Sequence, residues 1–148
     1  PIEDLATGGF REVLVDDTVD ANDVTRLVLC SGKLGHELET ARAEKEIGNV
    51  AIARVEQLYP FPKDTLLAEI ERFPNLEEIV WSQEEPRNMG AWAFIMQRFH
   101  DLGRPIRYCG RAESASPATG SYSRHNAEQD FVLRMSLGEV EPAPSLES

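Results

Sequence analysis

The sequence contains little cysteine, and its two cysteines are far apart. Cys30 and Cys109 are the only ones among 148 residues, and no CxxC pair occurs. So few cysteines exclude a disulfide-rich secreted scaffold. The absence of a Cys/His cluster at metal-ligand spacing argues against a zinc site. We therefore expect two buried, reduced thiols and no bound metal.

Basic residues and long apolar runs are also scarce. Lys and Arg number 15 against 26 Asp and Glu, which gives a net charge of −11. A chain this acidic has the same sign of charge as nucleic acids and anionic lipids, so we expect neither as a partner. No apolar run approaches the ~20 residues that span a bilayer. The chain does not open with a basic and then apolar signal segment.

The residues that are present suit one packed domain. Hydrophobic residues make up 41% of the chain and charged residues 28%. Short apolar runs predict strands at residues 26–30, 49–55, 78–81 and 106–109. Apolar residues at helical spacing follow each run: Leu34, Leu38 and Ala41; Leu66, Leu67, Ile70 and Phe73; Met89, Trp92, Met96 and Phe99; Ala127, Phe131 and Met135. This alternation predicts a three-layer α/β fold with a mostly parallel sheet of about five strands.

The two ends of the chain differ in composition from its middle. Residues 1–24 are rich in acids, so we interpret them as a segment that leads into the domain, with an edge strand at Arg11–Val15. The domain itself is predicted to span residues 25–137, and residues 138–148 to form a frayed tail. Loops are expected at Ser82–Asn88 and at residues 110–123, and the last helix at Arg124–Met135.

A basic stretch interrupts the acidic chain. Between Arg87 and Arg111 there are five arginines and one acid. Two interpretations stay open: the arginines pair with the acidic surface of the same domain, or they form a site for a phosphate-bearing ligand or an acidic partner. In a parallel sheet, ligands collect beyond the carboxyl ends of the strands. The loops Ser31–Lys33, Gln83–Asn88 and the one from Arg111 onward are expected to meet there.

These loops carry no self-contained catalytic set. Ser31-Gly32-Lys33 suits either a phosphate or an ordinary helix start. The neighbouring carboxylates of Glu84 and Glu85 suit pairing with arginines, structurally or at an interface, better than acid/base work. Arginines near Cys109 offer a way to lower its pKa.

Three longer motifs carry a more specific signal than these loops do. They are Glu-Gln-Leu-Tyr-Pro-Phe-Pro at 56–62, Gln-Glu-Glu-Pro-Arg-Asn-Met-Gly-Ala-Trp at 83–92, and Gly-Arg-Ala-Glu-Ser-Ala-Ser-Pro-Ala-Thr-Gly at 110–120. In this order they resemble the C-terminal domain of the decarboxylating first component of 2-oxoglutarate dehydrogenase. The resemblance runs from about Leu5 to about Leu137. Ser31-Gly32-Lys33 and His125 also fall where that family's pattern has them.

The resemblance implies a transketolase C-terminal-like fold and a supporting role. The parent enzymes depend on thiamine diphosphate and magnesium, held mainly by two preceding domains. They oxidatively decarboxylate 2-oxoglutarate in the tricarboxylic acid cycle and pass the succinyl group to dihydrolipoyl succinyltransferase. We therefore expect this chain alone to be inactive, with no cofactor and no catalytic residue of its own. The parent is expected in a bacterial cytoplasm or a mitochondrial matrix.

The same resemblance implies homodimer assembly and, in some members, an acetyl-CoA or nucleotide effector site. The effector residues it implies are Ser31, Lys33, Gln83 and Gly90, to which the basic stretch adds Arg87 and Arg111. For the dimer interface we expect Glu84, Glu85, Asn88 and Trp92. Many members have aromatic residues after the Lys of the Ser-Gly-Lys turn, whereas this chain has Gly35 and His36. Two alternatives stay open: a 2-oxoadipate dehydrogenase-type parent and a free-standing effector-binding module.

Overall fold

The computed structural model describes residues 12–111 and 122–141 of the chain. The strands are β1 (Val13–Leu14), β2 (Arg26–Cys30), β3 (Val50–Val55), β4 (Glu78–Pro86) and β5 (Arg107–Arg111). The helices are α2 (Lys33–Glu44), α3 (Lys63–Glu71), α4 (Trp92–Leu102) and α5 (Tyr122–Ser136). The strands form one five-stranded sheet in the order β1-β3-β2-β4-β5. The pairs β3–β2, β2–β4 and β4–β5 are parallel and β1 is antiparallel to β3, which confirms the predicted fold class.

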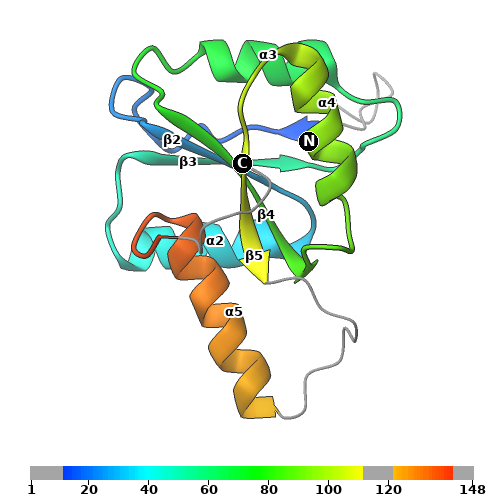
Figure 1. Cartoon of the computed structure of the whole chain (residues 1–148). Helices are drawn as coiled ribbons and strands as arrows, with labels where there is room; N and C mark the ends of the chain where they lie inside the picture. The colour runs from blue at the N-terminus through cyan, green and yellow to red at the C-terminus, as the bar shows by residue number, and fades with distance from the viewer. Residues whose placement is uncertain (1–11, 112–121, 142–148) are drawn as a thin grey trace, which may run out of the picture.

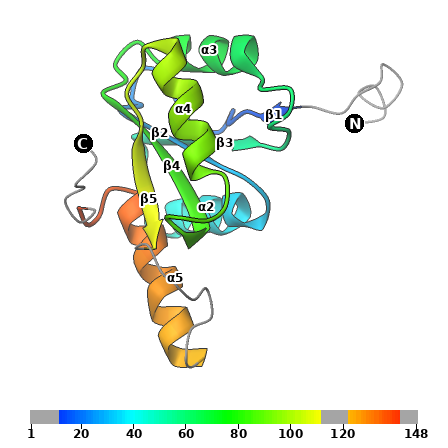
Figure 2. The same ribbon diagram turned by 45° about the vertical axis from the view of Figure 1, so that its right-hand side comes forward.

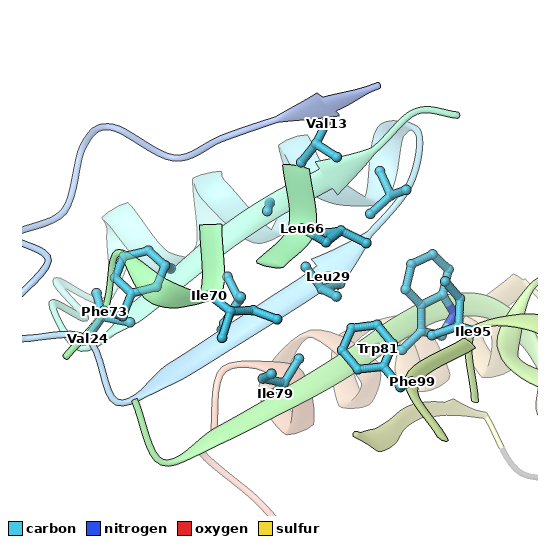
Figure 3. Close-up of a cluster of buried hydrophobic side chains, with 14 of the residues drawn as sticks. Val13, Val24, Leu29, Leu66, Ile70, Phe73, Ile79, Trp81, Ile95 and Phe99 are labelled. Atoms are coloured by element: carbon cyan, nitrogen blue, oxygen red, sulfur yellow. The ribbon is translucent and has the colours of Figure 1, made fainter. Parts of the chain in front are cut away.

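Helices cover both faces of the sheet. Helices α3 and α4 lie on one face and α2 and α5 on the other (Figure 1). The α3/α4 face encloses a cluster that includes Leu29, Trp81 and Phe99 (Figure 3). The α2/α5 face encloses a second cluster that includes Cys30 and Met135. The sheet thus separates two cores, because successive side chains of a strand point to opposite faces.

The local sequence explains where the elements lie. All five residues of β2 are buried, as expected for a central strand covered on both faces. In α2, Leu34 and Leu38 are one turn apart and both are buried, as the spacing predicted. Helix α4 ends at Gly103, which adopts the left-handed conformation that glycine takes most readily.

The segment before β2 is tied to the sheet by a buried carboxylate. The carboxylate of Asp16 pairs with Arg42 of α2 and accepts hydrogen bonds from Thr18 and from the Ile52 backbone N–H. Arg42 also donates to the Val50 carbonyl at 3.0 Å. Burial acts to raise the pKa of Asp16, but these hydrogen bonds, led by the one from Arg42, outweigh it and the pKa is lowered.

Two predicted boundaries around β4 are wrong. Residues 82–86 of the expected loop Ser82–Asn88 continue β4, which runs to Pro86. Helix α4 begins at Trp92, because a turn closed by Met89 N–H on the Pro86 carbonyl precedes it and Gly90 there has a φ of 68°. The apolar run that predicts this strand ends at Trp81. Because most of the residues after it are polar, the sequence did not indicate that the strand continues to Pro86.

The predicted inner faces of α4 and α5 also need correction. Met96 is 41% exposed and Met89 lies outside the helix, so Trp92, Ile95 and Phe99 form the buried face of α4. In α5, Ala127 and Phe131 are exposed, whereas Met135 is buried as predicted. The first turns of α5 project beyond the sheet, so within this chain only the C-terminal part of the helix packs on it (Figures 1 and 2).

The loop after β5 and the two ends lie partly outside the described residues. Gly110 and Arg111 of the expected loop belong to β5, and residues 112–121 are outside the description. Of the predicted tail, Val140 packs against the α2/α5 core and Glu139 pairs with Lys45. The domain boundaries stay predictions.

Candidate functional site

The parallel strands bring three of the predicted loops to one edge of the sheet. Leu29 of β2 pairs with Trp81 of β4, and Trp81 pairs with Tyr108 of β5. The residues after β2, along the end of β4 and at the end of β5 therefore follow neighbouring strands in the same direction (Figure 1).

The turn between β2 and α2 is open to solvent. Ser31, Gly32 and Lys33 are all exposed, and no side chain caps the start of α2. Gly32 adopts φ 64° and ψ −150°, a backbone conformation that only glycine takes readily. Its N–H donates to the Glu56 carboxylate at 3.4 Å. A helix start attracts anions when its backbone N–H groups lack a side-chain cap, and a lysine adds to this attraction. Here the anion that lies against it is the carboxylate of Glu56.

A further cation of this turn, Arg54, was not predicted. Its Nη1 lies 2.9 Å from Nε2 of His36 and 3.6 Å from the Glu56 carboxylate. A Cβ at Gly35 would lie 2.1 Å from Cδ of Arg54, so the stem of Arg54 occupies the space that a side chain at position 35 would fill. Arg54 is the only charged residue of β3, and that was the available signal in the sequence.

The turn between β4 and α4 is closed and internally bonded. Gln83 is 4% exposed, and its Oε1 accepts from Trp81 Nε1 at 2.8 Å and from the Trp92 backbone N–H at 3.0 Å. Its Nε2 donates to the carbonyls of Met89, at 2.7 Å, and Pro86, at 3.0 Å. Both ends of the amide are thus used within the chain. A Cβ at Gly90 would lie 3.1 Å from this amide, so Gly90 permits the close approach.

The remaining residues of this turn divide between core and surface. Trp92 is 5% exposed and its ring lies 5.4 Å from that of Tyr108. The guanidinium of Arg87 lies 4.9 Å from the Tyr108 ring and 5.7 Å from the Trp92 ring, which are cation–π contacts. Of the four predicted interface residues, Glu85 and Asn88 are exposed, Glu84 is half-buried and Trp92 belongs to the core.

Several arginines of the basic stretch pair with acids of the same domain. Arg98 lies 3.1 Å from Asp101, and Arg111 lies 3.5 Å from Glu128 of α5. Arg107 lies 2.9 Å from Glu78. These pairs favour the interpretation of the stretch as internal pairing over a continuous anion site.

The sheet separates the predicted effector residues. Arg54 pairs with Cys30 in the β3–β2 register and contacts α2, so it lies on the α2/α5 face. Gln83 bonds to Trp81 and α4, so it lies on the α3/α4 face. The side chain of His125 lies outside the described part. The structure therefore brings Ser31 and Lys33 together with Arg54, rather than with Gln83 and Arg87.

The described residues offer little for catalysis. Burial raises the pKa of Cys30 to about 12 and that of Cys109 to about 11, so neither is a reactive thiolate. The expected lowering of the Cys109 pKa is wrong: desolvation by burial outweighs Arg26 and Arg107, although both do act to lower it. Among residues 12–111 and 122–141, no group of three His, Cys, Asp or Glu is placed to hold a metal ion. No helix in this part is long and apolar enough to cross a membrane.

Comparison with known proteins decides the family. Residues 1–137 match the family model described as 2-oxoglutarate dehydrogenase C-terminal. The chain belongs to this family. It is 43% identical over 145 residues to the 2-oxoglutarate dehydrogenase E1 component of Cupriavidus necator, covering 95% of this chain and 15% of that protein. It is 41% identical over 140 residues to the mitochondrial 2-oxoglutarate dehydrogenase of Schizosaccharomyces pombe, covering 87% of this chain and 14% of that protein.

The relatives are much longer than this chain. A third, the E1 component of Shouchella clausii, is 41% identical over 144 residues, which are 93% of this chain and 15% of that protein. The chain thus spans about 15% of the length of the relatives it matches. A solved structure described as "Split gene transketolase, inactive beta4 tetramer" shares the fold with a TM-score of 0.60 and 11% identity, over 88% of this chain and 43% of that one. This likeness confirms the transketolase-like fold.

Proposed function

We propose that this chain serves as the C-terminal domain of a 2-oxoglutarate dehydrogenase E1 component. The parent oxidatively decarboxylates 2-oxoglutarate and passes the succinyl group to dihydrolipoyl succinyltransferase. The observation that carries this proposal is the 43% identity to the Cupriavidus necator enzyme over 95% of the chain. We assign the parent to a bacterial cytoplasm or a mitochondrial matrix, and the presence of both bacterial and mitochondrial enzymes among the relatives supports this assignment.

The reaction belongs to parts of the parent outside this chain. The described residues contain no cluster suited to a magnesium ion and no activated thiol. Because this chain spans about 15% of the length of its relatives, we assign thiamine diphosphate and its metal to the remainder of the parent. The chain alone should not release carbon dioxide from 2-oxoglutarate when thiamine diphosphate and magnesium are added, and turnover by it would overturn this assignment.

Assembly is the first role that we assign to the domain itself. The exposed residues Glu85 and Asn88, at the edge that follows β4, suit contact with a second subunit of a homodimer. A related fold unit is described as forming a tetramer, which supports assembly through this kind of domain. Charge reversal at Glu85 should lower the dimer fraction of the full-length protein in analytical ultracentrifugation, and an unchanged fraction would remove it from the interface.

Effector binding is the second role. We assign a phosphate-bearing effector, acetyl-CoA or a nucleotide, to Ser31, Lys33 and Arg54 at the start of α2. Lys33 and Arg54 are cationic, Ser31 and Gly32 offer donors, and the start of α2 adds the positive end of its dipole. Charge-assisted hydrogen bonds to phosphate are about twice as strong as neutral ones. Gln83, Gly90 and Arg87 are left out of this assignment because their turn lies on the other face of the sheet, and Arg111 pairs with Glu128 instead.

Calorimetry tests this site directly. Acetyl-CoA and ADP are titrated into the full-length protein, the K33A/R54A variant and the control K63A, which removes an exposed lysine at the start of α3. Loss of two phosphate contacts should weaken binding by about 30-fold, whereas K63A should leave it unchanged. Equal affinity of the wild type and K33A/R54A would contradict the assignment.

The choice of keto acid separates this proposal from its nearest alternative. A parent of the 2-oxoadipate type would turn over 2-oxoadipate faster than 2-oxoglutarate. The names of the relatives favour 2-oxoglutarate. Measuring kcat/KM for both acids with the full-length enzyme decides between them, because the domains that bind the substrate lie outside this chain.

A further inference from the structure

A groove lies between α2 and α5 and extends from His36, near the start of α2, to Lys45 just after its end. Its volume is about 410 Å³ and it is open to solvent on one side. The residues that line it are His36, Glu37, Thr40, Ala41, Glu44, Lys45, Asp130 and Leu133. The effector proposal assigns no ligand contact to these residues, although His36 contacts Arg54 where the groove meets the effector site.

The floor and rim of the groove differ in polarity. Ala41 and Leu133 are half-buried and pack against the α2/α5 core, so they give the groove an apolar floor. Carboxylates stand on both helices around it: Glu37 and Glu44 on α2, and Asp130 on α5. Glu44 and Asp130 are exposed, and Glu37 accepts a hydrogen bond from the Gln129 amide at 3.2 Å.

The two basic side chains that line the groove contact residues other than these three carboxylates. Lys45, which also lines the groove, pairs with Glu139 outside it. His36 contacts one other element and its own helix: its Nε2 lies 2.9 Å from Arg54 of β3, and its Nδ1 lies 3.7 Å from Glu39 of α2. The groove thus combines an apolar floor with an excess of negative charge on both sides.

We propose that this groove receives an arginine or lysine side chain from a basic segment of a partner protein. Such side chains carry an aliphatic stem and a charged head, which match an apolar floor and a carboxylate rim. The head would donate charge-assisted hydrogen bonds to carboxylates on two helices. An arginine that fills a pocket is also a common anchor of protein interfaces. A phosphate-bearing ligand does not suit this groove, because the rim has the same sign of charge.

The test uses the full-length protein and a defined probe. The probe is an alanine-based helical peptide with two arginines one turn apart, and its partner peptide has glutamines at both positions. Two double variants are compared: E44Q/D130N removes rim charge, and D64N/E71Q removes the same charge from exposed residues of α3 on the other face. Both variants change the net charge by the same amount. A difference in their affinity for the arginine peptide therefore shows that the peptide binds at the groove.

We expect the arginine peptide to bind the wild type at least tenfold tighter than the glutamine peptide. E44Q/D130N should lose about tenfold in affinity and D64N/E71Q less than twofold. Equal losses in both variants would show attraction to net charge alone and would overturn the proposal. Failure of the arginine peptide to bind the full-length protein would overturn it too, since the groove would then be covered by other parts of the parent or be without a partner.

Discussion

Two turns at the same edge of the sheet hold polar residues in opposite ways. At the β2–α2 turn, Ser31 and Lys33 are exposed, and the guanidinium of Arg54 contacts His36 and Glu56. At the β4–α4 turn, Gln83 is buried and both ends of its amide are bonded within the chain. A polar residue near the end of a strand can therefore bind a ligand only where its donors and acceptors do not already bond within the chain.

The largest expected effect concerns another polar group that is fully used within the chain, Asp16. Replacing it by alanine leaves Arg42 buried beside a cavity, so D16A should lower the free energy of unfolding by about 3–5 kcal/mol. Urea denaturation at pH 7 measures this loss. The matched control D17A removes an exposed neighbour and should cost less than about 0.5 kcal/mol.

The same carboxylate predicts a pH dependence. Its pKa in the folded protein is lowered, so the unfolded chain takes up a proton first as the pH falls. The stability from Asp16 is therefore complete above its ordinary pKa, near 3.8, and is lost as the pH falls through the lower folded value. The wild type should lose more stability than D16N between pH 5 and 3, roughly the range around these pKa values. Parallel curves would contradict the role of Asp16.

Gln83 should show the next largest effect. Q83A removes the partner of the Trp81 indole N–H and of the Trp92 backbone N–H, so it should cost about 2–3 kcal/mol of stability. S31A, at the open turn, should change stability by less than about 0.5 kcal/mol. If Q83A instead leaves the urea midpoint unchanged and only weakens acetyl-CoA binding, Gln83 is a direct ligand and the contrast between the turns fails.

A substitution at Gly35 tests whether the position of Arg54 matters at the β2–α2 turn. A methyl group there must displace Cγ and Cδ of Arg54, so G35A should weaken ADP binding by about fivefold. Gly48 is the matched control, because a Cβ there meets nothing within 4 Å. Calorimetry on both variants measures the difference, and equal affinities would mean that the position of Arg54 does not matter for the ligand.

The smallest effect is expected at Glu56. Its carboxylate lies against Gly32 N–H and near Arg54, where the phosphate of an effector would bind. E56Q removes a competing negative charge and should tighten ADP binding by about threefold. E39Q removes a carboxylate of α2 near His36 and should have no such effect. Weaker binding by E56Q would show that Glu56 supports the site rather than competes for it.

The fold followed from the sequence wherever burial dictated residue type. The run at 26–30 and the pair Leu34 and Leu38 predicted β2 and α2, because a central strand and the helix face over it must be apolar. The sequence did not predict the end of β4, because most of residues 82–86 are polar. Ser82 there bonds to Ser136 of α5, and Gln83 accepts from the Trp92 N–H of α4. Phe131 was placed inside because spacing alone does not show that α5 extends past the sheet.

The candidate site could be predicted only in part. The motifs identified Ser31, Lys33 and Gln83, and the parallel strands do bring them to one edge. The sequence did not show that the sheet separates Gln83 from Arg54, because that depends on which face each residue occupies in register. Nor did it show that Trp92 is buried, since a tryptophan beside charged residues suits both a core and an interface.

Hydrogen–deuterium exchange of the full-length protein, with and without acetyl-CoA, tests most directly which turn binds the effector. We predict slower exchange at residues 31–37 and 54–56, around the start of α2, with little change at residues 83–92, whose hydrogen bonds are formed without a ligand. Slower exchange confined to residues 83–92, or no change in either segment, would contradict the assignment of the effector to the β2–α2 turn.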